Sequence, residues 1–333
     1  MDRDTELMIV RRAYAKQVLA AAGVRDARIE DAYAAVRRED FLGPGPWPFF
    51  HLWPARYVPS PDADPVYLYT DSLVGIVPER FINNGQPSLH AALLAQARPS
   101  DGEHVVHVGA GVGYYTAIMA HLVGPTGRVT GIEFDADLAA RARANFGGAG
   151  NVEILQGDGA VVSFATADVI YVNAGATHPA TAWLDGLAEG GRLILPLTTE
   201  LPPPPTPEQR APATEPGTPT PEPRAAATEP GAPTSEPRPA ATEPPARTSE
   251  LRTIARQGAT FLIERLGPDY LARWISPVMI FPCAGSRDRV AEAALAAGFA
   301  KGGWEKVTRL YRSDDVPLEQ CWVRAPGWCL AYS

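Results

Sequence analysis

Strand-like and helix-like segments alternate from Val105 to Leu197, and this alternation constrains the fold more than any other feature. Short runs rich in Val and Ile are followed by segments whose apolar residues recur at helical spacing. Such alternation predicts an α/β fold with a Rossmann-like, doubly wound, mostly parallel sheet. The expected strands are VVHVG, RVTGIEF, VEILQG, DVIYVNA and RLILPL, and the expected helices are YYTAIMAHL, ADLAARARANF and TAWLDGLA.

The chain on either side of this core predicts further elements. Two helices are expected, from Glu6 to Ala22 and from Ala27 to Val36, and the Pro- and aromatic-rich stretch 43–65 predicts a loop packed on another part of the protein. GATFLIERL and YLARWISPVMIFP, which flank GPD, predict a C-terminal antiparallel hairpin. Beyond it we expect a helix over 287–298 and strands within 305–311 and 321–332.

Residues 201–250 differ sharply in composition from the rest. They hold 16 of the chain's 34 prolines and no aromatic residue, and Glu recurs every seventh position from 208 to 250. A heptad of this kind could form a coiled coil, but proline removes the helical backbone and the apolar seam is missing. We therefore predict a disordered insertion, with partner binding as the alternative.

Because strands are expected on both sides of this insertion, we predict that it interrupts a sheet and does not separate two domains. The expected organisation has four parts. Residues 1–100 form N-terminal helices and a substrate loop, 101–200 a cofactor-binding core, 201–250 the insertion, and 251–333 strands that complete the sheet, followed by an extension.

Charge and composition exclude several classes of protein. The net charge of -8 and a pI near 5.3, without a basic cluster, argue against nucleic acid. The N-terminus lacks the apolar core of a secretion signal, and no stretch is apolar for long enough to cross a membrane. The three cysteines suggest neither a disulfide framework nor a metal site. We expect a cytoplasmic monomer.

A glycine-rich turn, HVGAGVGYY at 107–115, follows the first strand of the core. In an open parallel sheet this turn lies at the edge where ligands bind, and glycine allows the backbone to approach them closely. Gly109, Gly111 and Gly113 have the spacing G-x-G-x-G, whereas a dinucleotide fold needs a third glycine where Tyr114 stands. The spacing resembles the first motif of class I methyltransferases, which use S-adenosylmethionine.

Acidic residues after the next strands fit the same ligand. Glu133 ends the second strand, where a carboxylate can accept both ribose hydroxyls. Asp158 and Gly159 follow the third, so that a carboxylate can take the adenine amino group while a backbone N–H meets the ring. Asp168 opens the fourth strand, whose far end is expected to face the methyl group.

Together these motifs resemble those of the protein-L-isoaspartate O-methyltransferase family. The likeness extends from about Leu7 to Leu197 and includes RRAYAKQVLAAAGVRDARIEDAYAAVRREDFL, YTDSLVGI, NNGQPSLHAALL, NAGATHPA and AEGGRLILPL. It implies methyl transfer from S-adenosylmethionine to the carboxylate of an isoaspartyl residue in a damaged protein or peptide. A carboxylate is already ionised near neutral pH, so this chemistry needs alignment and exclusion of water more than a strong base.

The substrate region departs from the family pattern. The family places Thr-Ile-Ser before a helix-starting proline, and its hydroxyls help to hold the substrate. If Pro87 is that proline, Asn83, Asn84 and Gly85 replace Thr-Ile-Ser; if Gly85 and Gln86 match the family's Gly-Gln, Ser88 is the nearby hydroxyl. We favour the first register because proline fixes the start of a helix, and we keep all four residues, Asn83, Asn84, Gly85 and Ser88, as candidates for substrate contact.

Two histidines are weaker candidates. His107 stands where the family's first motif has an acid, so a buried structural role is favoured, although its position keeps it among the candidate cofactor residues. His178, in the loop after the fourth strand, is a minor candidate for the pocket. Two alternatives to isoaspartyl repair stay open: methylation of a different carboxylate or peptide, and a non-catalytic scaffold that binds S-adenosylmethionine.

Overall fold

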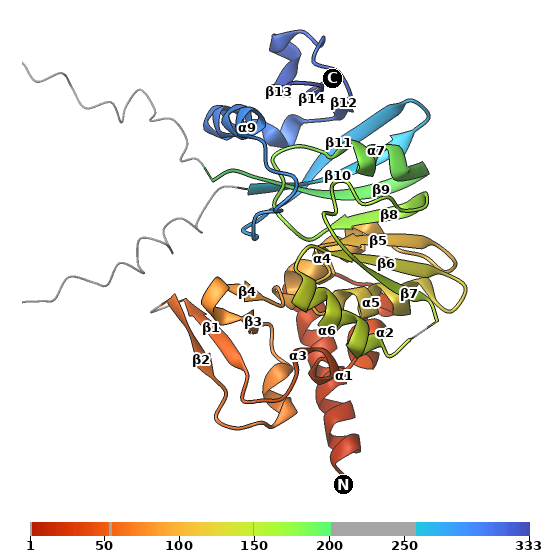
Figure 1. Cartoon of the computed structure of the whole chain (residues 1–333), viewed down its shortest axis with the longest axis vertical. Coiled ribbons are helices and arrows are strands. Elements are labelled where there is room, and N and C mark those ends of the chain that lie inside the picture. The colour runs from red at the N-terminus through yellow and green to blue at the C-terminus, as the bar shows by residue number, and fades with distance from the viewer. Residues whose placement is uncertain (1, 53–54, 149, 201–257) are drawn as a thin grey trace, which may run out of the picture.

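Five parallel strands form one half of a ten-stranded mixed sheet in the computed structural model, which describes residues 2–52, 55–148, 150–200 and 258–333. The order across the sheet is β13-β14-β12-β11-β10-β9-β8-β5-β6-β7 (Figure 1). Because β5 lies between β6 and β8, the chain reverses direction across the sheet at β5, which confirms the doubly wound fold. The parallel strands are β5 (His104–Val108), β6 (Arg128–Glu133), β7 (Val152–Gln156), β8 (Ala167–Val172) and β9 (Leu187–Thr198).

Antiparallel strands from the C-terminal part of the chain extend this sheet beyond β9. The predicted hairpin is present, and its first strand pairs with β9, from Gly258 opposite Thr198 to Glu264 opposite Arg192. Two neighbouring strands therefore flank the Pro-rich repeat, as expected, while the repeat itself lies outside the described residues. The strands are β10 (Gly258–Leu266), β11 (Asp269–Pro277), β12 (Arg309–Tyr311), β13 (Cys321–Ala325) and β14 (Trp328–Ala331). The last two correspond to the single strand region expected over 321–332.

Helices cover both faces of the sheet and bury two apolar clusters. The N-terminal helices with α4 and α5 pack on one face, and α7 and α9 on the other. Their boundaries follow local signals: Asp2 caps the first helix by accepting from the Thr5 N–H, and Gly23 ends it in a left-handed conformation. The helices are α1 (Arg3–Ala22), α2 (Ala27–Ala35), α3 (Glu39–Leu42), α4 (Pro87–Ala97), α5 (Tyr114–Val123), α6 (Ala136–Phe146), α7 (Thr181–Gly186) and α9 (Arg289–Lys301). No helix among the described residues has both the length and the apolar stretch needed to cross a membrane.

The prediction of a loop over 43–65 was wrong in part, because this stretch contains the antiparallel hairpin β1 (Pro48–Leu52) and β2 (Ala55–Pro59). Aromatic residues favour paired strands, and the rings of Phe50 and Tyr57 pack edge-on across the pair at 5.3 Å. The prolines stand only at the strand ends, where a missing N–H costs little. A second small hairpin, β3 (Gly75–Val77) and β4 (Ile82–Asn83), follows and leads into α4.

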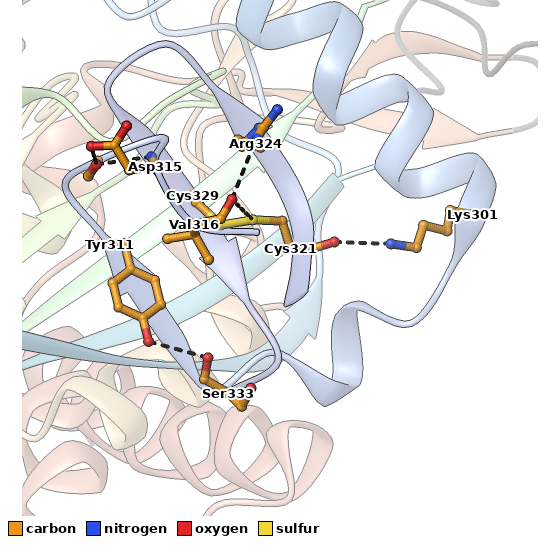
Figure 2. Close-up of a disulfide and its surroundings, with 9 residues drawn as sticks. Lys301, Tyr311, Asp315, Val316, Cys321, Arg324, Cys329 and Ser333 are labelled. Atoms are coloured by element: carbon orange, nitrogen blue, oxygen red, sulfur yellow. Dashed lines mark hydrogen bonds between the residues drawn. A yellow bond between two sulfur atoms is a disulfide. The ribbon is translucent and has the colours of Figure 1, made fainter. Parts of the chain in front are cut away.

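Cys321 and Cys329 form a disulfide between β13 and β14, so the expectation of no disulfide was wrong (Figure 2). The sequence gives no signal because the chain has three cysteines and these two are eight residues apart. Pairing follows from the hairpin, which sets Arg324 opposite Cys329 and brings the two cysteines together. The bond lies in a small buried cluster with Ala331, at the end of the sheet far from β7.

We expect loss of this disulfide to lower the free energy of unfolding by about 2 kcal/mol, because the cross-link restricts the unfolded chain over a short loop. Denaturant unfolding with and without a thiol reductant measures the difference. The double variant Cys321→Ser/Cys329→Ser is the control, since reductant should not change its stability. Equal stability of the oxidised and reduced wild-type protein would contradict the prediction.

Candidate active site

A cavity of about 340 Å³ lies where the central parallel strands end. The segments after β5, β6, β7 and β8 contribute to its wall, as the topology of a doubly wound sheet requires. The β3–β4 region and the chain after β11 contribute the remaining wall. The lining residues fall in five groups: 76, 80 and 82–85; 108–111 and 115; 132–135 and 138; 158–159 and 173–174; and 280–285.

The glycine turn lies at this cavity only in part. Gly109 and Gly111 line it and have positive φ angles of 80° and 57°, which residues other than glycine rarely adopt. Gly113 does not line it. It caps α5 at φ 95°, and a Cβ there would approach Phe146 to 2.7 Å. Its observed contacts pack α5 against α6, and its role as a cofactor residue stays a prediction.

Glu133 fixes the turn through both carboxylate oxygens. Oε2 accepts from the Gly111 N–H at 2.7 Å, and Oε1 accepts from the Asp135 N–H at 2.9 Å. The side chain is only 8% exposed, and burial raises the pKa of its carboxyl group while the two backbone N–H groups act in the opposite direction. Each oxygen retains acceptor capacity, so the carboxylate can still bind a ligand hydroxyl.

Asp158 and Gly159 line the cavity. The Asp158 carboxylate accepts from the Ala160 N–H at 2.9 Å, which shapes the turn after β7. The Gly159 carbonyl accepts from the indole of Trp183, and a Cβ at Gly159 would meet Val108 at 2.4 Å. Asp168 lies at the other end of β8, where it accepts from the His104 N–H. The cavity end of β8 carries Asn173 instead.

The substrate candidates separate into two kinds. Asn83, Asn84 and Gly85 line the cavity, but the Asn83 amide is engaged locally, since it accepts from the Gly85 N–H at 2.8 Å and donates to the Phe81 carbonyl. Asn84 is 7% exposed, and its Nδ2 has no hydrogen-bond partner in the described structure. Such a group is costly unless a ligand satisfies it.

Ser88 and the two histidines do not line the cavity. Ser88 lies in the first turn of α4, and its hydroxyl donates to the Asp71 carboxylate. His107 is fully buried, bonds to the Thr116 hydroxyl at 2.8 Å, and burial lowers its pKa to about 3, so it is a neutral core residue and not part of the cavity wall. His178 bonds to Thr177 outside the cavity. These three candidates are corrected because their side chains turn into neighbouring helix and loop contacts.

Several cavity residues were missed from the sequence. Arg80 pairs with Asp135 at 2.5 Å and joins the β3–β4 region to the start of α6. Tyr115 donates to the Gly85 carbonyl and stacks on His90, with ring centroids 3.5 Å apart. No sequence pattern singled out Arg80, because its place in the cavity wall goes with a contact to a residue 55 positions away.

Comparisons with known proteins identify relatives of this chain. The family model described as protein-L-isoaspartate(D-aspartate) O-methyltransferase matches residues 55–202. A protein-L-isoaspartate O-methyltransferase from Rhodopseudomonas palustris is 33% identical over 198 residues, which cover 59% of this chain and 72% of that protein. The chain belongs to the protein-L-isoaspartate O-methyltransferase family.

A further relative and two solved structures show similarity to this chain. The Thermotoga maritima protein-L-isoaspartate O-methyltransferase is 31% identical, and the match covers 55% of this chain and about half of that protein, 54%. Among solved structures, a protein-L-isoaspartate O-methyltransferase superposes with a TM-score of 0.55 at 22% identity, covering 83% of this chain and 66% of the other. A Plasmodium falciparum protein described as a beta-aspartate methyltransferase, in complex with S-adenosyl-L-homocysteine, gives 0.53 at 16% identity, covering 83% and 98%. Both structures support the fold.

Proposed function

We propose that this protein transfers a methyl group from S-adenosylmethionine to the carboxylate of L-isoaspartyl residues in damaged proteins or peptides. The observation that carries the proposal is the buried, unpaired amide of Asn84 in the cavity that also contains Gly109, Gly111 and Glu133. An amide N–H is a suitable donor to a carboxylate, and in the favoured register Asn84 lies between the two positions, Asn83 and Gly85, where the family has its hydroxyls.

The cavity residues fit S-adenosylmethionine. Glu133 and Asp158 offer carboxylate oxygens to ribose and adenine. A Cβ built on Gly111 would have only the Ile76 side chain within 4 Å, at 3.9 Å. Three carboxylates and one guanidinium, from Glu133, Asp135, Asp158 and Arg80, give the wall an acidic balance that suits a cationic ligand. The P. falciparum relative, which binds S-adenosyl-L-homocysteine, supports the same choice.

The protein contributes to catalysis by positioning the acceptor carboxylate beside the methyl donor. When bound, S-adenosylmethionine supplies a methyl group on a positively charged sulfur, which is a good leaving group. Asn84 would hold one oxygen of the acceptor carboxylate and orient the other, while Tyr115 fixes the neighbouring Gly85 carbonyl. The acceptor is already ionised at neutral pH, so no residue has to remove a proton.

Methyl transfer from labelled S-adenosylmethionine to an isoaspartyl peptide, beside the same peptide with normal aspartate, tests this function. We expect incorporation only into the isoaspartyl peptide. S-adenosylmethionine binding without incorporation would instead favour a different carboxylate acceptor or a scaffold without turnover.

We further propose that the protein acts as a monomer in the cytoplasm on protein substrates and not on nucleic acid, in line with its net charge of -8. Because cytoplasmic thiols are normally kept reduced, this proposal expects Cys321 and Cys329 to be thiols in the cell, although their positions allow a disulfide. Mass spectrometry of protein alkylated directly in lysed cells would show which form is present.

We also propose the four-part organisation 1–100, 101–200, 201–250 and 251–333, in which the repeat is a passive insertion. Deleting residues 201–250 should leave the methyl-transfer rate within about twofold, because Thr198 and Gly258 face each other in the sheet and a short connection can join them. Activity of the deleted and full-length proteins on the same peptide gives the comparison. A loss of activity with an unchanged melting temperature would assign the repeat a role in substrate binding.

A further inference from the structure

Arg80 is the only cationic side chain among the residues that line the cavity. The same lining carries three carboxylates, from Glu133, Asp135 and Asp158. A cationic methyl donor suits such a wall, but the acceptor of the proposed reaction is itself a carboxylate, which these three groups repel. A positive charge in the wall would offset this repulsion, and within the described lining Arg80 alone supplies one.

The turn that carries Arg80 is held in an unusual backbone conformation. Arg80 ends the short helix Pro78–Arg80, and Phe81 caps this helix in the left-handed region, with φ 56°. A bulky residue rarely adopts this conformation, and it persists only where surrounding contacts impose it. The Phe81 carbonyl accepts from the hydroxyl of Tyr57 and from the side-chain amide of Asn83. These two bonds fix the turn, and the fold thereby places Arg80 at the cavity wall.

The guanidinium of Arg80 pairs with Asp135, and this pair can be exchanged for another. Nη1 lies 2.5 Å from Oδ2, and the contact lowers the pKa of the Asp135 carboxyl, so both groups are charged at neutral pH. The Arg80 side chain is 58% exposed, and ion pairs in contact with water contribute little to stability. The other oxygen of Asp135 caps α6 by accepting from the N–H groups of Asp137 and Leu138, so the cap does not depend on Arg80.

We propose that Arg80 leaves Asp135 and pairs with the acceptor carboxylate beside the Asn84 amide. A planar guanidinium matches the two oxygens of a carboxylate, whereas the amide is a neutral donor. Methyl transfer turns the acceptor into an uncharged ester, so the product loses this pair and Arg80 returns to Asp135. Arg80 thus makes the site bind the unmethylated carboxylate more tightly than the product. The inference rests on the proposed function and adds to it a residue that selects the charge of the acceptor.

Peptide binding in the presence of S-adenosyl-L-homocysteine tests the proposal without turnover. Calorimetry compares an isoaspartyl peptide with the same peptide in which the acceptor carboxylate is a primary amide, which has the same shape but no charge. Wild-type protein should bind the carboxylate peptide at least about tenfold more tightly than the amide. In Arg80→Gln this preference should fall below about twofold, because glutamine supplies no charge.

Arg56→Gln is the matched control, because Arg56 is an exposed arginine of β2 that does not line the cavity. It should keep the wild-type preference. S-adenosylmethionine carries a carboxylate of its own, which is a second candidate partner for Arg80. If the acceptor is the partner, Arg80→Gln should bind S-adenosyl-L-homocysteine within about twofold of the wild-type affinity.

A second variant tests the exchange of partners. Asparagine caps a helix as well as aspartate does, so Asp135→Asn should keep α6 capped while it releases Arg80. We expect this variant to bind the carboxylate peptide about two- to fivefold more tightly than the wild type, because the acceptor no longer competes with Asp135 for the guanidinium. Equal or weaker binding would overturn the exchange.

The outcomes separate the two hypotheses. If the wild type neither methylates the isoaspartyl peptide nor binds it more tightly than the amide, the proposed function fails and this inference with it. If the wild type methylates the peptide but Arg80→Gln keeps the full preference for the carboxylate, only this inference is overturned. Loss of S-adenosyl-L-homocysteine affinity in Arg80→Gln, with the peptide preference retained, would assign Arg80 to the donor carboxylate and would also overturn it.

Discussion

Asn84→Asp should lower kcat/KM for an isoaspartyl peptide by on the order of 100-fold, because a carboxylate would replace the one unpaired amide donor of the cavity wall and would repel the acceptor carboxylate. The side chain keeps its size and shape, so the change acts mainly through charge and hydrogen bonding. Asn84→Ala, which removes the donor without adding a charge, should cost about tenfold. Steady-state kinetics with a peptide series measure both, and the loss should fall mainly on KM if Asn84 holds the ground-state substrate.

A matched control for this prediction is Gln320→Glu, the same conversion of amide to carboxylate at an exposed position in the short helix Leu318–Gln320. It should leave the kinetics unchanged. Affinity for S-adenosyl-L-homocysteine should also be unchanged in Asn84→Ala. Wild-type kinetics in Asn84→Asp would show that the acceptor carboxylate lies elsewhere in the cavity.

Glu133→Ala should weaken S-adenosyl-L-homocysteine binding by about 1–3 kcal/mol, or roughly 5- to 150-fold, because it removes the ribose acceptor and leaves two backbone N–H groups without their partner. Isothermal calorimetry gives the affinity, and thermal unfolding reports any collapse of the turn. Glu153→Ala, at an exposed position of β7, is the control and should bind normally.

The protonation state of Glu133 gives an independent check. Burial raises the pKa of this carboxyl group, so its charged form is lost at a higher pH than for an ordinary glutamate. Affinity should therefore fall as pH is lowered through this raised pKa, and Glu133→Gln should flatten that dependence. Unchanged affinity in Glu133→Ala would reject the assignment of Glu133 to the donor.

The sequence by itself determined the core of the fold and one edge of the site. Strand and helix periodicity are local properties, and a right-handed parallel crossover leaves few topologies for five such units. The same rule places Gly109, Glu133 and Asp158 together, because the carboxyl ends of parallel strands meet at one edge. The position of the repeat between two paired strands also followed from the patterns that flank it.

Tertiary structure alone decided which contacts the side chains of each candidate set make. Asn83 and Asn84 are equivalent in sequence, yet one amide bonds to its own turn and the other stays unpaired. His107 and Gly113 belong to the glycine motif but pack into the core. Side-chain direction depends on contacts with α4, α5 and α6, and such contacts leave no periodic trace in the sequence.

The loop after β11 and the disulfide were hidden for the same physical reason. Each depends on pairing between residues brought together by the sheet: Gly285 with Asp158, and Cys321 with Cys329 across a hairpin. Short-range patterns predict strands, but they do not specify which loop returns to a distant edge. The local sequence therefore determined the scaffold, and long-range packing completed the site.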